Sequence, residues 1–180
     1  MNSQTSIRII PIGCVDSSVL EYLVDILSKR FNTEAEIRSS IPVELFEVDK
    51  LRKQYLSTSM LRMLSSMPSL PEEVSLGVAD VDLYVPSLNF VFGEAGPSRR
   101  VAVISITRLR QSFYGSPDDV DLFLNRLGKE AVHEVGHIFR LGHCSQPRCV
   151  MYFSNSLADT DRKDDDFCNK CRTQLSIVSK

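Results

Sequence analysis

The spacing of apolar and polar positions divides the first part of the chain into strands and helices. Residues 7–12 form an unbroken apolar run followed by turn residues, which is typical of a buried strand. Residues 17–31 carry apolar side chains three and four positions apart, which predicts an amphipathic helix. Residues 33–39 alternate and predict a second strand, and residues 50–66 show helical spacing that ends before two prolines.

The middle of the chain predicts three more strands and one long helix. The strands are expected in β-branched and apolar segments at residues 74–84, 88–92 and 101–107, with a loop between the last two. A Ser-Pro-Asp-Asp sequence beginning at Ser116 is a helix-start signature, and its helix should run to about residue 139 or 141. Strands that alternate with helices predict an α/β fold.

The C-terminal part is short and chemically distinct. We expect a first subdomain over residues 1–142, ending with the long helix, and a small C-terminal subdomain over residues 143–180. A segment of fewer than about 40 residues seldom folds without a metal, a disulfide or extensive docking. The acidic run at residues 159–166 is interpreted as a solvated loop rather than a calcium site or a binding surface for basic substrates.

The composition excludes several classes of partner. Lys plus Arg number 21 and Asp plus Glu number 23, so the net charge of −2 argues against nucleic acid or an anionic membrane. No stretch approaches the roughly 20 apolar residues of a membrane span, and the N-terminus lacks a signal-peptide pattern. We therefore expect a cytoplasmic protein. Nothing in the sequence sets the oligomeric state, and a monomer is favoured.

The three histidines of the chain all lie within 11 residues. His133, Glu134 and His137 form an HExxH pattern, which on a helix places both imidazoles on one face, where they can bind one zinc ion. Zinc lowers the pKa of a bound water to about 7, and Glu134 would take its proton as general base. Two histidines that pack on a helix without metal are the alternative, but this explains neither the third histidine nor the nearby cysteines.

His143 is the expected third zinc ligand, provided that the chain reverses before it. In a continuous helix His143 would lie ~9 Å beyond His137 along the axis. A zinc–nitrogen bond of about 2.0–2.1 Å cannot span that gap. A turn is therefore required after Ile138, and Gly142 is the expected residue with positive φ.

Four of the five cysteines lie in the last quarter of the chain: Cys144, Cys149, Cys168 and Cys171. Two thiolate pairs at these spacings predict a closed tetrahedral zinc site with a structural role. Four free thiols, disulfides or an iron–sulfur centre are the less favoured alternatives. The fifth, Cys14, is interpreted as an inert thiol at the end of a strand.

These motifs together resemble the metzincin zinc peptidases, and more narrowly the archaemetzincins. The resemblance rests on HEVGHIFRLGHC, the following Cys-x-Met and the terminal Cys-x-x-Cys, and it extends over most of residues 74–171. It implies a twisted mixed sheet with backing helices and an active-site helix. By the same resemblance, Leu88–Gly93 is the edge strand that would bind an extended peptide, and Met151 is an apolar floor beneath the zinc histidines.

One position departs from the family pattern. Metzincins usually have glycine three residues after the second histidine, where this chain has Arg140. Either Arg140 takes positive φ at a cost of about 1–2 kcal/mol, or it stays helical and Gly142 makes the turn.

The leading hypothesis is a zinc metallopeptidase that acts on peptides or proteins, with two zinc ions per chain. It would hydrolyse the peptide bond through a zinc-activated water with Glu134 as general base. The alternative is a zinc-stabilised peptide- or protein-binding module of metzincin fold with little or no peptidase activity, in which Arg140 displaces the third ligand.

Overall fold

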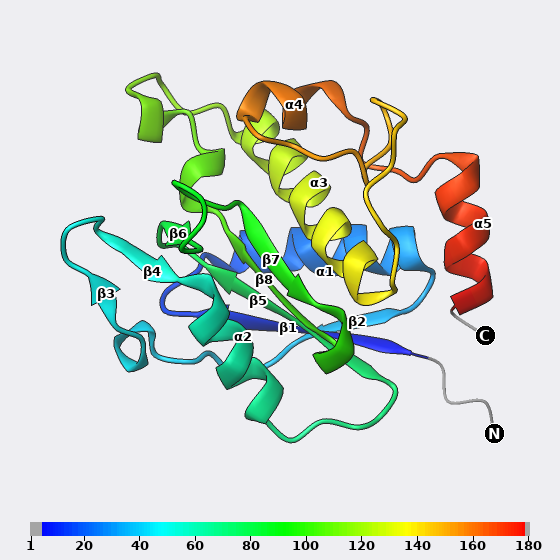
Figure 1. The fold of residues 1–180 in the computed structure, drawn as a ribbon, viewed down its shortest axis with the longest axis horizontal. Helices are drawn as coiled ribbons and strands as arrows, with labels where there is room; N and C mark the ends of the chain where they lie inside the picture. Colours follow the sequence, from blue (N-terminus) through cyan, green and yellow to red (C-terminus); the bar gives the residue numbers. More distant parts are fainter. Residues whose placement is uncertain (1–4, 179–180) are drawn as a thin grey trace.

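A five-stranded mixed sheet forms the centre of the computed structural model, which describes residues 5–178 (Figure 1). Its strands, in spatial order, are β2 (Glu34–Ile37), β1 (Ser6–Ile12), β5 (Glu73–Ala79), β8 (Val101–Ser105) and β7 (Gly93–Gly96). The first four are parallel, and β7 runs antiparallel to β8 at the edge of the sheet. One edge of the sheet is therefore an antiparallel strand with an open side.

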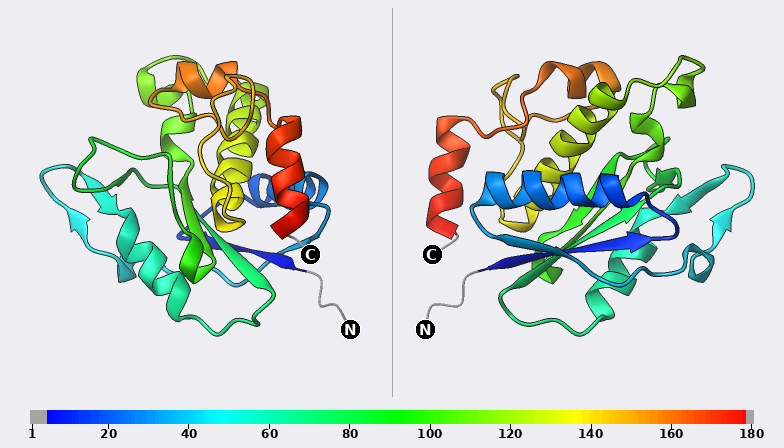
Figure 2. Two further views of the ribbon diagram at one scale, coloured as in Figure 1. Left: turned by 45° about the vertical axis from the view of Figure 1, so that its right-hand side comes forward. Right: turned by 180° about the vertical axis from the view of Figure 1, so that it is seen from behind.

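Helices cover both faces of this sheet (Figure 2). Helices α1 (Ser17–Phe31) and α3 (Val120–Ile138) pack on one face, and α2 (Ser57–Ser66) packs on the other. The short helices α4 (Leu157–Arg162) and α5 (Asn169–Val178) lie on the side of α1 and α3. No helix within residues 5–178 is long and apolar enough to cross a bilayer.

The predicted α1 has the expected bounds because both of its ends carry local signals. The Asp16 carboxylate accepts a hydrogen bond from the Ser18 amide at 2.8 Å, and Asn32 ends the helix in the left-handed conformation. The division of the chain between residues 142 and 143 stays a prediction. Buried residues of the C-terminal segment, Val150 and Met151 among them, pack in the same hydrophobic cluster as α1 and α3.

The helix predicted over residues 50–66 is wrong in its first half. A small second sheet forms there instead, from β3 (Val48–Asp49), β4 (Gln54–Leu56) and β6 (Leu83–Tyr84). The single strand predicted over residues 74–84 is correspondingly divided into β5 and β6. The Gln54 amide donates hydrogen bonds to the Asp82 carboxylate and the Asn89 carbonyl, so long-range contacts override the local helical spacing.

The edge strand also lies later in the chain than predicted. Residues 88–92 form no regular strand, and β7 occupies residues that were predicted to be a loop. Phe92 is buried and Phe90 packs on it, so apolar character here reflects packing of a loop. Pairing with β8 makes Gly93–Gly96 a strand despite its two glycines.

Two further predictions need correction. The N-cap of α3 is Asp119, whose carboxylate accepts from the Leu122 amide at 3.0 Å, and not Ser116. The acidic run is not a solvated loop: it includes α4, and Asp161 forms an ion pair with the buried Arg126 of α3 at 2.7 Å. The part of the chain that the structure describes also contains four short 3₁₀ turns: η1 (Val43–Leu45), η2 (Pro97–Arg99), η3 (Thr107–Leu109) and η4 (Ser112–Tyr114).

Candidate active site and cysteine cluster

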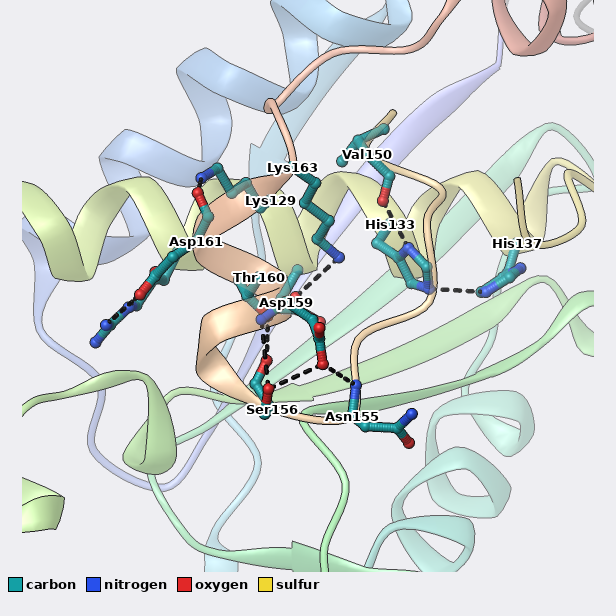
Figure 3. Close-up of polar contacts among 12 residues, drawn as sticks. Lys129, His133, His137, Val150, Asn155, Ser156, Asp159, Thr160, Asp161 and Lys163 are labelled. Atoms are coloured by element: carbon teal, nitrogen blue, oxygen red, sulfur yellow. Dashed lines mark hydrogen bonds and ion pairs between the residues drawn. The ribbon is translucent and has the colours of Figure 1, made fainter. Parts of the chain in front are cut away.

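Three imidazoles converge at the C-terminal end of α3. His133 and His137 lie one turn apart on the helix, and their Nε2 atoms are 3.1 Å from each other (Figure 3). The ring of His143 stacks on that of His133 with 5.4 Å between centroids and lies 4.8 Å from that of His137. The predicted ligand atoms of all three lie within 4.8 Å of one another.

The outward nitrogens of two of these rings are held by backbone carbonyls. His133 Nδ1 lies 2.8 Å from the Val150 carbonyl oxygen, and His137 Nδ1 lies 2.7 Å from that of Leu141. A carbonyl can only accept, so Nδ1 carries the hydrogen and the neutral ring leaves Nε2 as a bare lone pair. Two lone pairs 3.1 Å apart repel each other unless a cation lies between them, so the donor set fits a metal ion.

The electrostatic environment keeps these rings in the form that binds metal. Burial, with a further contribution from the Lys163 cation, holds the pKa of His133 well below its usual value. Burial also lowers the pKa of His137 and of His143. All three imidazoles are therefore neutral near pH 7, as metal ligation requires.

The chain reverses after α3 at Arg140, not at Gly142 as the spacing suggested. Arg140 has φ 62° and donates its amide to the His137 carbonyl at 2.9 Å. Leu141 then donates to the Gly136 carbonyl at 3.1 Å, which completes a left-handed helix cap. Among the described glycines, positive φ occurs at Gly13 and Gly115. This cap brings His143 to the other two imidazoles. Arg140 therefore does not displace the expected third ligand, contrary to what the hypothesis of a binding module assumed.

Glu134 lies beside the imidazoles and is almost completely buried. Burial and the neighbouring Glu130 carboxylate raise its pKa to about 8, and the Lys163 cation opposes this shift. The Glu134 side chain crosses the start of β7 so closely that a Cβ on Gly93 would lie 2.6 Å from Glu134 Cγ. Glycine at this position therefore makes room for the carboxylate.

A hollow of about 380 Å³ opens between α3 and β7. It is lined by residues 88–95 of the β7 side, by Glu130, His133, Glu134, His137 and His143, and by residues 153–155. The Phe92 carbonyl accepts from the Ser105 amide at 2.7 Å. Hydrogen-bonded and non-hydrogen-bonded residue pairs alternate along an antiparallel ladder. Because Phe92 is hydrogen-bonded to β8, Gly93 and Ala95 are not, and their backbone groups face the open edge and this hollow.

Met151 packs against the C-terminal part of α3 in the hydrophobic core. It is fully buried, and its Sδ would be 2.5 Å from a Cβ on Gly136, one residue before His137. The Met151 carbonyl accepts from the Cys144 amide at 2.8 Å, so this segment also holds the residue after His143. This burial agrees with an apolar floor and equally with an ordinary core methionine.

The four C-terminal cysteines form a second cluster. The sulfur atoms of Cys144, Cys149, Cys168 and Cys171 all lie within 4.8 Å of one another. A backbone amide hydrogen bond from Cys171 helps to lower the pKa of Cys168 to about 7, whereas burial raises the pKa of Cys149 and of Cys171. Four convergent sulfurs fit a metal ion that would keep them all as thiolates. Cys14 is exposed just after β1 and lies outside this cluster.

Sequence reasoning missed two charged residues next to the histidines. The Lys163 ammonium is fully buried and lies 3.1 Å from the Glu130 carboxylate, which also accepts from the Thr160 hydroxyl at 3.0 Å. Figure 3 shows the Lys163 side chain extending toward α3 from the segment after α4. Glu130 could have been found as the i−4 neighbour of Glu134 on one helix face. Lys163 carried no signal, because it lies within an acidic run.

Comparison with known proteins adds independent information. Residues 18–177 match the model of a family described as Peptidase family M54. The archaemetzincin of Pyrococcus abyssi is 42% identical over 175 residues, which cover 94% of this chain and 93% of the relative. That of Methanocaldococcus jannaschii is 42% identical over 165 residues, covering 92% and 89%.

Solved structures agree with these sequence matches. The archaemetzincin of Archaeoglobus fulgidus, crystallised in complex with malonate, is similar with a TM-score of 0.82 and 41% identity, over 94% of this chain and 99% of that one. A zinc-dependent peptidase of Methanocorpusculum labreanum has a TM-score of 0.83 and 31% identity over the same shares, 94% and 99%.

Proposed function

This chain belongs to peptidase family M54, the archaemetzincins, and is a zinc metallopeptidase; we propose that it cleaves peptide bonds in the hollow between α3 and β7, with Glu134 as general base. One observation carries the proposal. Three imidazoles converge beside the buried carboxylate of Glu134, and the hollow that they share borders an open strand edge.

Two sets of side chains would hold zinc, which gives two ions per chain. His133, His137 and His143 supply three nitrogen ligands and leave a fourth position open, as a catalytic site requires. Zinc bound there would supply Lewis acidity that polarises the scissile carbonyl and makes water more acidic. The four cysteines of the second cluster supply a closed set of sulfur ligands, which suits a structural ion.

Glu134 would move the protons of the reaction. Glu134 directly follows His133 and lines the same hollow as the three imidazoles. Its raised pKa makes the ionised carboxylate a stronger base than an ordinary glutamate, and a zinc cation bound beside it would favour that ionised form. It can therefore accept a proton from the attacking water and release it to the leaving amine. The Lys163–Glu130 ion pair limits the repulsion between the Glu130 and Glu134 carboxylates, which leaves Glu134 able to release that proton.

The substrate would bind as an additional strand. The outward backbone groups of Gly93 and Ala95 can pair with an extended peptide, which would carry its scissile bond past Glu134. This mode of binding requires only the peptide backbone, and it agrees with peptides or proteins as the substrate class of the family.

The test compares Glu134→Gln with the exposed surface variant Glu44→Gln. Glu134→Gln should keep about two zinc ions per chain by elemental analysis and lose at least about 100-fold in peptide hydrolysis, because general-base catalysis contributes about 10²–10⁴-fold. Glu44→Gln should match the unmodified chain in both measurements. Unchanged turnover in Glu134→Gln would refute the assigned role of Glu134.

A further inference from the structure

A second hollow continues the first at the C-terminal end of β7 and reaches Arg140. Its volume is about 400 Å³. Ala95 and His137 line both hollows, so the two hollows adjoin, and together they are called the groove below. The remaining lining residues of the second hollow are Pro97, Arg140, Leu141 and Gly142. Figure 1 shows this region, where the last turn of α3 lies beside the end of β7 and η2.

The charges of this groove are divided between its ends. The first hollow contains carboxylates, but Glu94 already accepts hydrogen bonds from Ser57 and Thr58, and Glu130 is paired with Lys163. The described lining of the second hollow includes one charged side chain, that of Arg140. Arg140 is exposed and makes no ion pair or side-chain hydrogen bond within residues 5–178. Its guanidinium is thus available to a ligand.

The backbone of Arg140 is also unusual. Its φ of 62° is a conformation that side-chain-bearing residues rarely adopt and that glycine adopts freely. A strained residue that borders a binding groove is a pointer to a function for its side chain. A cation at the C-terminal end of a helix also interacts favourably with the helix dipole, so the experiment has to separate these two roles.

The position of Arg140 along a bound peptide follows from β7. The contact between Gly93 and Glu134 places the general base at the level of Gly93. A strand advances about 3.4 Å per residue, so Ala95 lies about 7 Å and Gly96, the last residue of β7, about 10 Å farther toward Arg140. A peptide paired antiparallel to β7 extends its amino-terminal side in this direction. The second or third residue before the scissile bond therefore comes next to Arg140.

We propose that Arg140 makes this peptidase select substrates with an aspartate or glutamate at the second or third residue before the scissile bond. This inference rests on the proposed function, because it assumes that the substrate lies along β7. A guanidinium and a carboxylate at a partly open site form a charge-assisted hydrogen bond, for which we expect a preference of about three- to tenfold over glutamine.

The experiment uses the zinc-loaded full chain and a peptide library whose cleavage sites are identified by mass spectrometry. Cleaved sequences are then resynthesised with Glu, Gln or Lys at each of the two positions, and kcat/KM is measured. The unmodified chain should prefer Glu, Arg140→Gly should show no preference, and Arg140→Glu should prefer Lys. Arg62→Glu, on the exposed side of α2 outside this groove, is the charge-matched control and should keep the preference of the unmodified chain.

The outcomes separate this inference from the proposed function. The inference is overturned if the preference for Glu survives in Arg140→Gly and Arg140→Glu, or if the unmodified chain shows no preference. The charge of Arg140 would then act only on the C-terminal end of α3. If no peptide is cleaved, binding of the Glu, Gln and Lys peptides to Glu134→Gln is measured by fluorescence anisotropy. Tighter binding of the Glu peptide that depends on Arg140 supports the inference even though hydrolysis fails. Binding that does not depend on Arg140, or the absence of binding, overturns it.

Discussion

Replacing Gly93 with alanine should inactivate the protein without unfolding it. The added Cβ would lie 2.6 Å from Cγ, 2.8 Å from Cδ and 2.8 Å from Oε1 of Glu134, and these are its three nearest neighbours. Carbon atoms in contact are normally about 3.5–4.0 Å apart, so the Glu134 side chain has to move by about 1 Å. The backbone φ of Gly93 is not positive, and alanine is otherwise tolerated in a strand.

The expected result follows from this displacement. A 1 Å misplacement of a catalytic group costs about 100-fold in rate, so kcat/KM on a quenched fluorescent peptide should fall by about that factor in Gly93→Ala. Stability should change by less than about 1 kcal/mol, because the clash is relieved by one side chain and alanine gains about 0.5–1 kcal/mol of backbone entropy over glycine.

Gly96→Ala is the matched control on the same strand. Its added Cβ would have its nearest neighbour, Val101 Cγ2, at 3.8 Å, an ordinary contact. The control should keep its melting temperature and zinc content, as Gly93→Ala should, and should also keep activity. Full activity in Gly93→Ala would refute the placement of Glu134 against β7. A large loss of melting temperature in Gly93→Ala would show instead that the strand does not tolerate the methyl group.

Three further predictions concern stability and metal content. Cys168→Ser should lower the zinc content by about one ion per chain and the melting temperature by at least about 5 °C, because a closed site loses a ligand. Retention of both zinc ions would contradict a four-cysteine site. Lys163→Met should lower the free energy of unfolding, measured with denaturant, by about 3–5 kcal/mol, because it leaves the buried Glu130 carboxylate without its cation. Adding Glu130→Met should recover at least half of this loss, and additive losses would argue against the ion pair. Arg140→Gly should raise the melting temperature by about 2–4 °C, because glycine adopts the positive φ without strain and the folded state becomes about 1 kcal/mol more stable. A lower melting temperature would mean that the interaction of Arg140 with the helix dipole outweighs the strain.

The convergence of the candidate site's side chains was predictable because it depends on local spacing. On a helix, positions four residues apart share a face, so the HExxH pattern alone places His133 and His137 together. The predicted closeness of the four cysteines and the need for a turn before His143 also followed from sequence, and the structure brings these residues together as expected. The strands of the central sheet that form continuous apolar runs were identified for the same reason, since burial on both faces leaves a clear pattern.

Only the tertiary structure decided which segment forms the open edge of the sheet and which charged residues lie beside Glu134. Residues 93–96 contain two glycines and have little intrinsic strand preference, and they become β7 because β8 offers a partner in register. The turn occurs at Arg140 because the chain has to cap α3 within three residues of His137. This requirement outweighs the preference of arginine for negative φ. Lys163 reaches Glu130 through the docking of α4 on α3 across 33 positions of sequence. Local patterns predict contacts within a helix or strand, whereas a contact between distant segments exists only after the core has brought them together.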